Sequence, residues 1–273
     1  KNKSDSSIIM VGGKHYSQGV LFRSYDNGQT WSNPERISEK RLNTFEVIED
    51  KMFASDHEGV IYRSKDNGLS WEEYQTAHWR DIKDICFVNN DTGFVVGAEV
   101  FSRGIVYRTF NGGNKWSLCH DTLKPSLNFV HVKSTEVYAG GYGVVIKSHD
   151  MGGSWDTLII VGDNWQGAFT LNNETYFYGL GGKLVKENGE KVYAPSSLLK
   201  PAIGWRSHIK NEQYVLIFGK NGRMLLSEDN GKSWHLEKTG LKEELHSGVF
   251  VSNNSGIIVG EEGTLGFFEI GEQ

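Results

Sequence analysis

Residues 24–31, Ser24-Tyr25-Asp26-Asn27-Gly28-Gln29-Thr30-Trp31, decide the fold because the same pattern returns along the chain. Three more copies fit the consensus S-x-D-x-G-x-[ST]-W, and a fifth departs from it at three positions. Five matches to an eight-residue pattern in 273 residues are not a chance event. The further copies are residues 64–71 (SKDNGLSW), 148–155 (SHDMGGSW) and 227–234 (SEDNGKSW), and the looser one is 109–116 (TFNGGNKW).

Each copy lies between an apolar or aromatic run and a Trp, which predicts strand, tight turn, strand. An Asp carboxylate can accept backbone N–H groups of its own turn, and Gly can adopt the positive φ that a chain reversal needs. The Trp then begins the returning strand and can fill space against a neighbouring sheet. We therefore expect a structural role in folding for the third residue of each copy: Asp26, Asp66, Asn111, Asp150 and Asp229.

The spacing of the copies predicts the architecture. Successive Trp residues are separated by 71 − 31 = 40, 116 − 71 = 45, 155 − 116 = 39 and 234 − 155 = 79 residues, and the last gap is two periods with one copy missing. A period near 40 with about four short strands per repeat is typical of a β-propeller blade. The degenerate copy falls near residues 183–190, which keep Asn188-Gly189, a hairpin signal, but lack the Trp. We expect an all-β chain forming one propeller domain (1–273), with seven blades at about 7–35, 36–74, 75–119, 120–158, 159–195, 196–237 and 238–273.

These copies resemble the Asp-box, or bacterial neuraminidase repeat, of sialidases, sortilin-type receptors and xyloglucanase-type propellers. Their near-regular spacing, with the run Gly93-Phe94-Val95-Val96-Gly97, resembles most the photosystem II stability/assembly factor-like propellers. The resemblance implies blades of mostly four antiparallel strands. It places the boxes on one face and implies that ligands bind on the opposite face. The two terminal blades are expected to have three strands each.

Composition limits the classes of function. The net charge of −5 disfavours nucleic acid and anionic membranes as partners, and no apolar run reaches the roughly 18 to 20 residues of a membrane helix. Cys86 and Cys119 are expected on the innermost and outermost strands of one blade, too far apart for a disulfide. We expect no cofactor, no metal site and a monomer. Because the chain begins with Lys1 and a polar segment, we expect an exported protein whose signal segment is absent from this sequence.

A second repeat marks the entries to the innermost strands, where a large apolar residue is followed by a hydrogen-bonding one. We expect the apolar residue to pack between blades and the polar residue to turn toward the central channel. Arg80 and Arg206 could together bind a carboxylate, sulfate or phosphate, or each could pair with a local acid. The aromatic members are candidates for sugar stacking. The ligand-binding candidates are Asn43, Arg80, Asn128, Gln166, Arg206, His246, Trp79, Trp165 and Trp205.

Loops that join second to third strands supply further candidates for ligand binding. Each of these residues could equally be an exposed polar residue without a role in binding. They are His15, Tyr16, Asp56, His57, Glu58, Glu99, Arg103, Tyr142, Lys220, Glu261 and Glu262, with Asp163 from a link between blades.

We interpret the chain as a non-catalytic, exported recognition or scaffold propeller that binds a protein or glycan on the face opposite the boxes. The alternative is a sialidase-like glycoside hydrolase. A sialidase would bring three arginines, a Tyr–Glu nucleophile pair and an acid Asp, whereas only two arginines occupy the predicted ring. A third hypothesis is a structural domain without a ligand pocket. We find no zinc-type His or Cys spacing, no G-x-S-x-G elbow and no phosphate-binding loop in the sequence.

Overall fold

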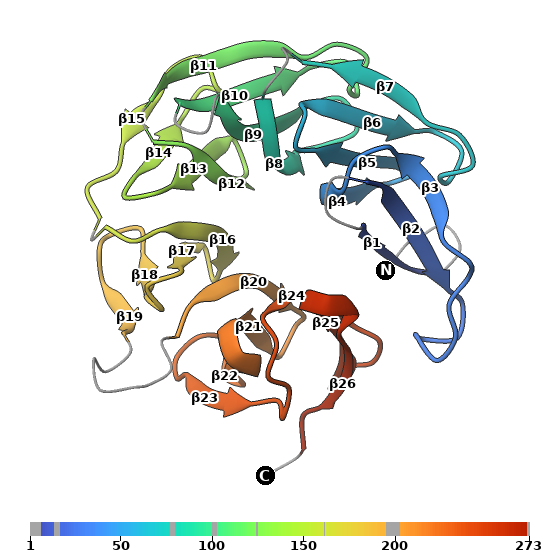
Figure 1. Cartoon of the computed structure of the whole chain (residues 1–273). Coiled ribbons are helices and arrows are strands. Elements are labelled where there is room, and N and C mark those ends of the chain that lie inside the picture. The colour runs from blue at the N-terminus through green and yellow to red at the C-terminus, as the bar shows by residue number, and fades with distance from the viewer. Residues whose placement is uncertain are drawn as a thin grey trace. The chain divides into compact units, whose positions relative to one another are not determined.

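The chain folds as a seven-bladed β-propeller with three or four antiparallel strands in each blade (Figure 1). A computed structural model describes residues 7–13, 17–76, 80–99, 103–123, 125–160, 162–194 and 203–271. Helix is confined, in these ranges, to two single turns of 3-10 helix, η1 (Lys220–Gly222) and η2 (Glu261–Gly263). The predicted fold class is confirmed. The contacts divide the chain into two compact units, and each is described by itself below.

The first unit, residues 1–142 and 146–157, contains four sheets in which sequential strands are neighbours. In the described ranges blade one has three strands and the next three blades have four each. The strands are β1 (Ile8–Gly12), β2 (Gly19–Ser24), β3 (Glu35–Ser38); β4 (Leu42–Ile48), β5 (Lys51–Asp56), β6 (Val60–Ser64), β7 (Glu72–Gln75); β8 (Arg80–Phe87), β9 (Gly93–Glu99), β10 (Arg103–Thr109), β11 (Ser117–Leu123); β12 (Leu127–Lys133), β13 (Glu136–Gly141), β14 (Val145–Ser148) and β15 (Asp156–Thr157).

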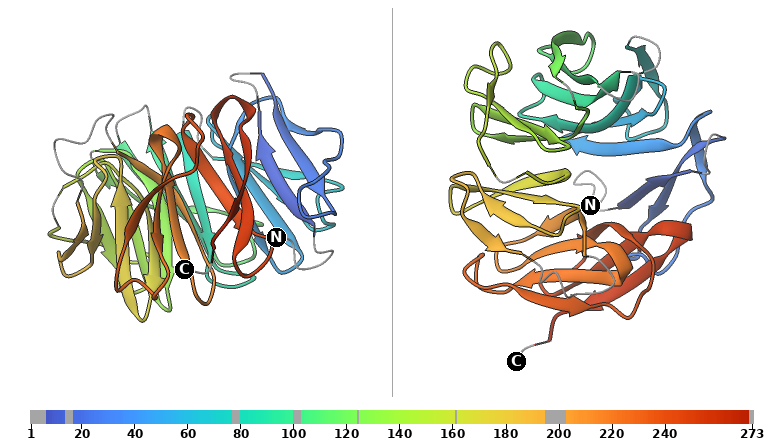
Figure 2. Two further views of the ribbon diagram at one scale, coloured as in Figure 1. Left: turned by 90° about the horizontal axis from the view of Figure 1, so that it is seen from below. Right: turned by 60° about the vertical axis from the view of Figure 1, so that its left-hand side comes forward.

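The second unit, residues 143–145 and 158–273, contains three sheets. Blade seven has three described strands, and Figure 2 shows the strands of each blade running side by side. The strands are β16 (Trp165–Leu171), β17 (Glu174–Gly179), β18 (Leu184–Lys186), β19 (Lys191–Tyr193); β20 (Trp205–Lys210), β21 (Val215–Gly219), β22 (Arg223–Ser227), β23 (His235–Lys238); β24 (Leu245–Phe250), β25 (Ser255–Gly260) and β26 (Leu265–Glu269).

The eight-residue repeats form the tight turns between the last two strands of their blades. In the first copy, Asp26 accepts the backbone N–H of Thr30 at 2.9 Å and bonds to the hydroxyls of Ser24 and Thr30. Ser24 Oγ in turn accepts the N–H of Gly28 at 2.7 Å. Both the fourth and fifth residues have positive φ, 57° at Asn27 and 85° at Gly28. In this copy the side chains of Ser24, Asp26 and Thr30 form hydrogen bonds within their own turn.

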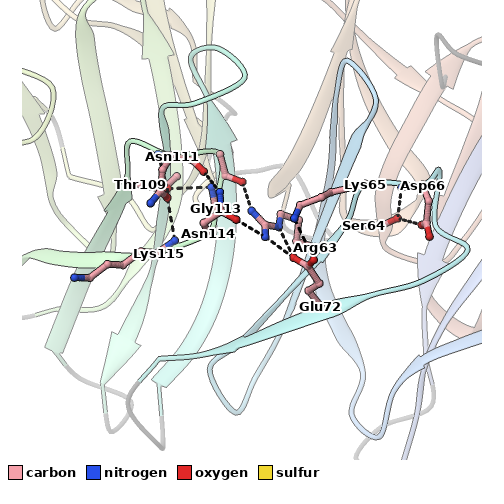
Figure 3. A network of polar contacts seen from close by, with 11 residues as sticks. Arg63, Ser64, Lys65, Asp66, Glu72, Thr109, Asn111, Gly113, Asn114 and Lys115 are labelled. Carbon is pink, nitrogen blue, oxygen red and sulfur yellow. Dashed lines mark hydrogen bonds and ion pairs between the residues drawn. The ribbon is translucent and has the colours of Figure 1, made fainter.

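An Arg immediately before a box links that box to the next one. Arg63 Nη1 donates to the carbonyl of Gly112 at 2.7 Å, and Nη2 reaches Asn114 Oδ1 at 2.8 Å and Glu72 (Figure 3). Arg23 and Arg108 repeat the bond, donating at 2.6 Å to the carbonyls of the fourth residue in the following boxes, Asn67 and Met151. Three successive blade pairs of the first unit are therefore joined by the same hydrogen bond.

The core of each unit lies between its blades. In the first unit, Phe53 of blade two stacks on Phe87 of blade three at 4.2 Å, and Trp116 packs in the same cluster. In the second unit, Phe169 and Tyr176 of blade five pack with Trp205 and Trp234 of blade six. Trp116 is buried, whereas the other four box tryptophans, Trp31, Trp71, Trp155 and Trp234, are only half-buried.

Two smaller predictions are confirmed. Cys86 and Cys119 are free thiols on β8 and β11, the opposite edges of their sheet. The degenerate hairpin of blade five keeps its turn without a Trp: Gly189, with φ of 87°, donates its N–H to Lys186, and Lys186 donates to Glu190.

Candidate functional site

In blades two to seven, the innermost strand has a bulge next to a large apolar residue near its start. Opposite that residue the second strand carries a Gly in five blades, for example Gly97 opposite Ile82 and Gly141 opposite Leu127, and Asp56 opposite Leu42 in blade two. A Cβ at these glycines would collide with the backbone of the inner strand, at Asp81 for Gly97 and at Ser126 for Gly141. The bulge places the polar residue after the apolar one between two ladder pairs. The apolar residues are Leu42, Ile82, Leu127, Trp165, Trp205 and Leu245.

This register corrects the ring predicted for blade three. The residues equivalent to Leu42-Asn43 are Ile82-Lys83, and not Trp79-Arg80 as the sequence repeat suggested. Trp79 lies outside the described residues. The Gly opposite five of the six bulges is a signal that the sequence contains, because Gly97 aligns with Gly141, Gly179, Gly219 and Gly260 at the ends of the second strands.

The two aromatic candidates of this repeat that the structure describes, Trp165 and Trp205, cannot stack on a sugar. Trp165 and Trp205 are both fully buried, and the indole of Trp205 donates to the carbonyl of Gly182 at 2.7 Å. With no ring face exposed, the expectation that they offer glycan-stacking surface is wrong. Trp205 packs against residues of blade five, Leu245 against blade six and Leu42 against blade one.

The polar positions of the first unit are linked laterally from blade to blade. Asn43 Nδ2 donates to Asp81 Oδ1 at 2.8 Å and to the Ile82 carbonyl at 2.9 Å. Lys83 Nζ donates to Asn128 Oδ1 at 3.1 Å and reaches Ser126 Oγ at 3.4 Å. Asn43 bonds to blade three and Lys83 bonds to blade four, so Asn43, Lys83 and Asn128 form a row of polar residues with lateral hydrogen bonds across blades two, three and four.

Lys83 is the cationic member of this row. Both of its hydrogen-bond acceptors are neutral, and among the described residues its ammonium has no ion pair within 4.0 Å. Burial lowers the pKa of Lys83, while the nearby Asp81 carboxylate opposes that shift. Burial also raises the pKa of Asp81, with Lys83 and the bond from Asn43 acting in the opposite direction. A half-buried ammonium with neutral partners is stabilised by an added anion.

Two carboxyl groups that were not among the ligand-binding candidates of the sequence lie farther along the same strands. Asp84 accepts the N–H of Ile85 and, across the blade boundary, the N–H of Val130, both at 2.9 Å. Burial raises its pKa to about 7. Glu46 accepts the N–H of Phe87 at 3.2 Å, and burial, aided by Asp84, raises its pKa to about 8. These groups bind adjacent inner strands together.

In the second unit, Arg206 joins three blades. Its Nη1 donates to Gln166 Oε1 on β16 at 2.9 Å, and its Nε bonds to Glu244 just before β24. Gln166 also donates to Asn164 at 3.0 Å. His246 lies 4.0 Å from Glu261 and is about half exposed. Gln166 and Arg206 thus repeat in this unit the lateral contact that Lys83 makes with Asn128 in the first.

Arg80 is held inside its own blade. It is buried, donates to the Tyr107 hydroxyl, and lies 3.5 Å from Glu99, which also binds Arg103. The local acid that pairs with Arg80 is therefore Glu99. Arg80 is thus engaged in structural contacts and does not occupy the polar row.

Most of the loop candidates also have local partners. Asp56 is buried and accepts the N–H groups of Glu58 and Val60, and Asp163 accepts those of Asn164 and Gly181 at 2.6 Å. Tyr142 is exposed, and His15 and Tyr16 lie outside the described residues. Within the described ranges, no group of His, Cys, Asp and Glu side chains is arranged to hold a metal ion. No helix in the same ranges has the length and hydrophobicity of a membrane span.

Comparisons with known proteins support the fold. No protein-family model and no curated protein matches the chain. Among solved structures, it is similar to YCF48 bound to D1 peptide, with a TM-score of 0.70 and 16% identity over 97% of this chain and 96% of that one. YCF48 from Cyanidioschyzon merolae matches with a TM-score of 0.64 and 16% identity over 96% and 95% of the two chains. BamB from Moraxella catarrhalis matches with a TM-score of 0.60 and 14% identity over 98% of this chain and 83% of that one.

Proposed function

We propose that this protein is a non-catalytic recognition propeller that binds an acidic segment of a partner protein at Lys83, on the end of the blades away from the boxes. The observation that carries the proposal is the half-buried Lys83 ammonium, whose two hydrogen-bond acceptors, Ser126 and Asn128, are both neutral. A partner carboxylate placed beside it would form a direct ion pair, which the more distant Asp81 carboxylate does not. The similarity to YCF48 bound to D1 peptide supports a peptide as the ligand of such a fold.

The neighbouring residues fit a recognition role. Asn43 and Asn128 are held by lateral hydrogen bonds, so Lys83 is presented on a pre-organised row. The glycoside hydrolase hypothesis relied on Arg80 and Arg206 facing a ligand. Because each guanidinium already has a carboxylate partner, Glu99 and Glu244, we propose recognition and not hydrolysis.

Binding of acidic peptides to matched lysine variants tests the proposal. The probes are a panel of synthetic peptides with Asp- or Glu-rich sequences, each with a free and an amidated C-terminus, measured by isothermal titration calorimetry. Lys83→Met keeps the aliphatic stem and removes the charge. It should weaken binding about tenfold or more, as loss of a charge-assisted hydrogen bond does.

The matched control is Lys51→Met. Lys51 also bridges two blades, through the Asn90 carbonyl at 2.9 Å, but it lies beside the box residue Gly112. Equal affinity of Lys51→Met and the native protein would support the proposal. Unchanged affinity in Lys83→Met, or a preference for sialyllactose over every peptide, would contradict it.

A further inference from the structure

Strand β26 (Leu265–Glu269) forms an outer edge of its blade in the described structure. In the five four-stranded blades the third strand is covered by a fourth, as β22 is covered by β23. In the described part of blade seven the sheet order stops at β24-β25-β26. The edge of β26 therefore offers backbone groups that the equivalent strands elsewhere use for pairing.

The register identifies these groups. Gly260 donates its N–H to Thr264 at 3.0 Å, and Ile270 donates to Asn254 at 2.8 Å, so the even-numbered residues of this segment bond to β25. Because bonding alternates along an antiparallel strand, the N–H and C=O groups of Leu265, Phe267 and Glu269 point away from β25. In blade six the equivalent residues are Met224 and Leu226, which pair with β23.

The side chains of this strand are also unusually accessible. Phe267 is 63% exposed and Leu265 is 38% exposed, whereas every residue of β22 is buried. Proteins commonly protect exposed strand edges with Lys, Pro or a bulge. The sequence of β26, Leu-Gly-Phe-Phe-Glu, contains neither Lys nor Pro, and its pairing with β25 has no bulge.

Charge indicates which occupant fits. Residues 245–273 contain Glu261, Glu262, Glu269 and Glu272 but no Lys or Arg, so they carry a net charge of 0 − 4 = −4 out of −5 for the whole chain. Glu261, Glu262 and Glu269 are all exposed. A strand placed along this edge meets apolar side chains flanked by carboxylates.

We propose that the free edge of β26 binds an extended, basic segment of a partner protein by strand addition. The segment would lie antiparallel to β26, bond to the outward groups of Leu265, Phe267 and Glu269, and alternate apolar with Lys or Arg side chains. A second copy of β26 fits less well. An antiparallel pair centred on Phe267 would bring the glutamates of the two copies together at both ends.

The probe is an acetylated and amidated peptide of about seven residues that alternates Val and Lys, a typical strand length. Amide exchange by NMR should show protection at Leu265, Phe267 and Glu269 when the peptide is added. Binding should weaken with added salt, because the carboxylates attract the lysines. A peptide of alternating Val and Glu is the matched control and should give no protection.

Two variants locate the contact. Phe267→Pro removes an outward N–H that β25 does not use, and should weaken peptide binding about tenfold or more. The triple variant E261Q/E262Q/E269Q leaves the backbone intact and should remove the salt dependence, which keeps the proposal testable if Phe267→Pro fails to fold.

Several outcomes would overturn the inference. Protection of the three amides without peptide would mean that another segment of this chain covers the edge. A concentration-dependent dimer that protects them would assign the edge to a second copy. Peptide binding that is equal in all variants would place the contact elsewhere. Lys83→Met should leave this interaction unchanged, so failure here is distinguishable from failure of the proposed function.

Discussion

Asp84 is a carboxyl group whose protonation should set part of the pH dependence of stability. Burial raises its pKa from 3.8 to about 7. Between these values the folded protein holds a proton that the unfolded chain releases. The contribution of Asp84 to the free energy of unfolding is therefore fully present below about pH 3.8. It is lost as the pH rises to about 7. Glu46, with its pKa raised by burial to about 8, acts with the same sign up to a higher pH.

We expect Asp84→Asn to flatten the decline in the free energy of unfolding between pH 5 and 7 by about 1 to 2 kcal/mol. Asn keeps an oxygen that can accept the Val130 N–H and removes the titration. Urea melts across this range provide the measurement. The box carboxylates do not interfere: hydrogen bonds from Thr30 and Ser70 hold the pKa values of Asp26 and Asp66 near 2, so their contribution is lost only at lower pH. Parallel curves for the variant and the native protein would contradict the expectation.

Met151 occupies a backbone conformation that disfavours its side chain. Its φ is 57°, and the same box position holds Asn27, Asn67 and Asn230 with φ values of 57° to 61°. Asn tolerates this left-handed region better than other residues with a Cβ. We expect Met151→Asn to raise the free energy of unfolding by about 0.5 to 1 kcal/mol, and Asn67→Met to lower it by a similar amount. Denaturant melts that move both variants in one direction would refute this account.

At the scale of the element, the hydrogen bond from Arg63 to the next box should contribute more than an ordinary ion pair. Arg63 is buried, and its removal leaves the Gly112 carbonyl without that bond. We expect Arg63→Met to lower the free energy of unfolding by about 2 to 3 kcal/mol, as loss of a buried hydrogen bond to a charged group does.

Arg103→Met provides the comparison for Arg63. Arg103 is about half exposed and pairs with Glu99 only four residues away. An exposed pair of this kind contributes about 0 to 1 kcal/mol. Urea melts should therefore show a clearly larger loss in the free energy of unfolding for Arg63→Met than for Arg103→Met. Equal losses would mean that the hydrogen bond between boxes contributes no more to stability than an exposed ion pair.

Some of these structural features can be predicted from the sequence and others cannot. The box turns could be predicted because Ser24, Asp26 and Gly28 act on groups within eight residues of one another. The box-to-box bond joins Arg63 to Gly112, 49 positions away, and only the recurrence of Arg before three boxes pointed to it. The ring position of blade three was misassigned because Trp79 and Ile82 are both large apolar residues, and the bulge that distinguishes them is a property of strand pairing.

At the scale of the whole molecule, the repeat period predicted seven blades because each blade closes its own hairpins over about 40 residues. The lateral contacts of the candidate site could not be predicted in the same way. Lys83 and Asn128 lie 45 positions apart, and their contact depends on how two sheets pack. The concentration of negative charge in residues 245–273 was visible in the sequence, but its meaning depends on β26 being an edge.

The two compact units should differ in their resistance to opening. The first unit has three box-to-box arginine bonds, from Arg23, Arg63 and Arg108. In the second unit the box of blade six receives a neutral bond instead, from Asn172 to the Asn230 carbonyl at 3.2 Å. Neutral hydrogen bonds contribute less than those from charged donors. We therefore expect hydrogen exchange in rising denaturant to show residues 158–271 opening at a lower concentration than residues 7–142. The triple variant R23M/R63M/R108M should remove the difference by lowering the first unit alone. If both units of the native protein opened at the same denaturant concentration, the arginine hydrogen bonds would not make the first unit more resistant to opening than the second.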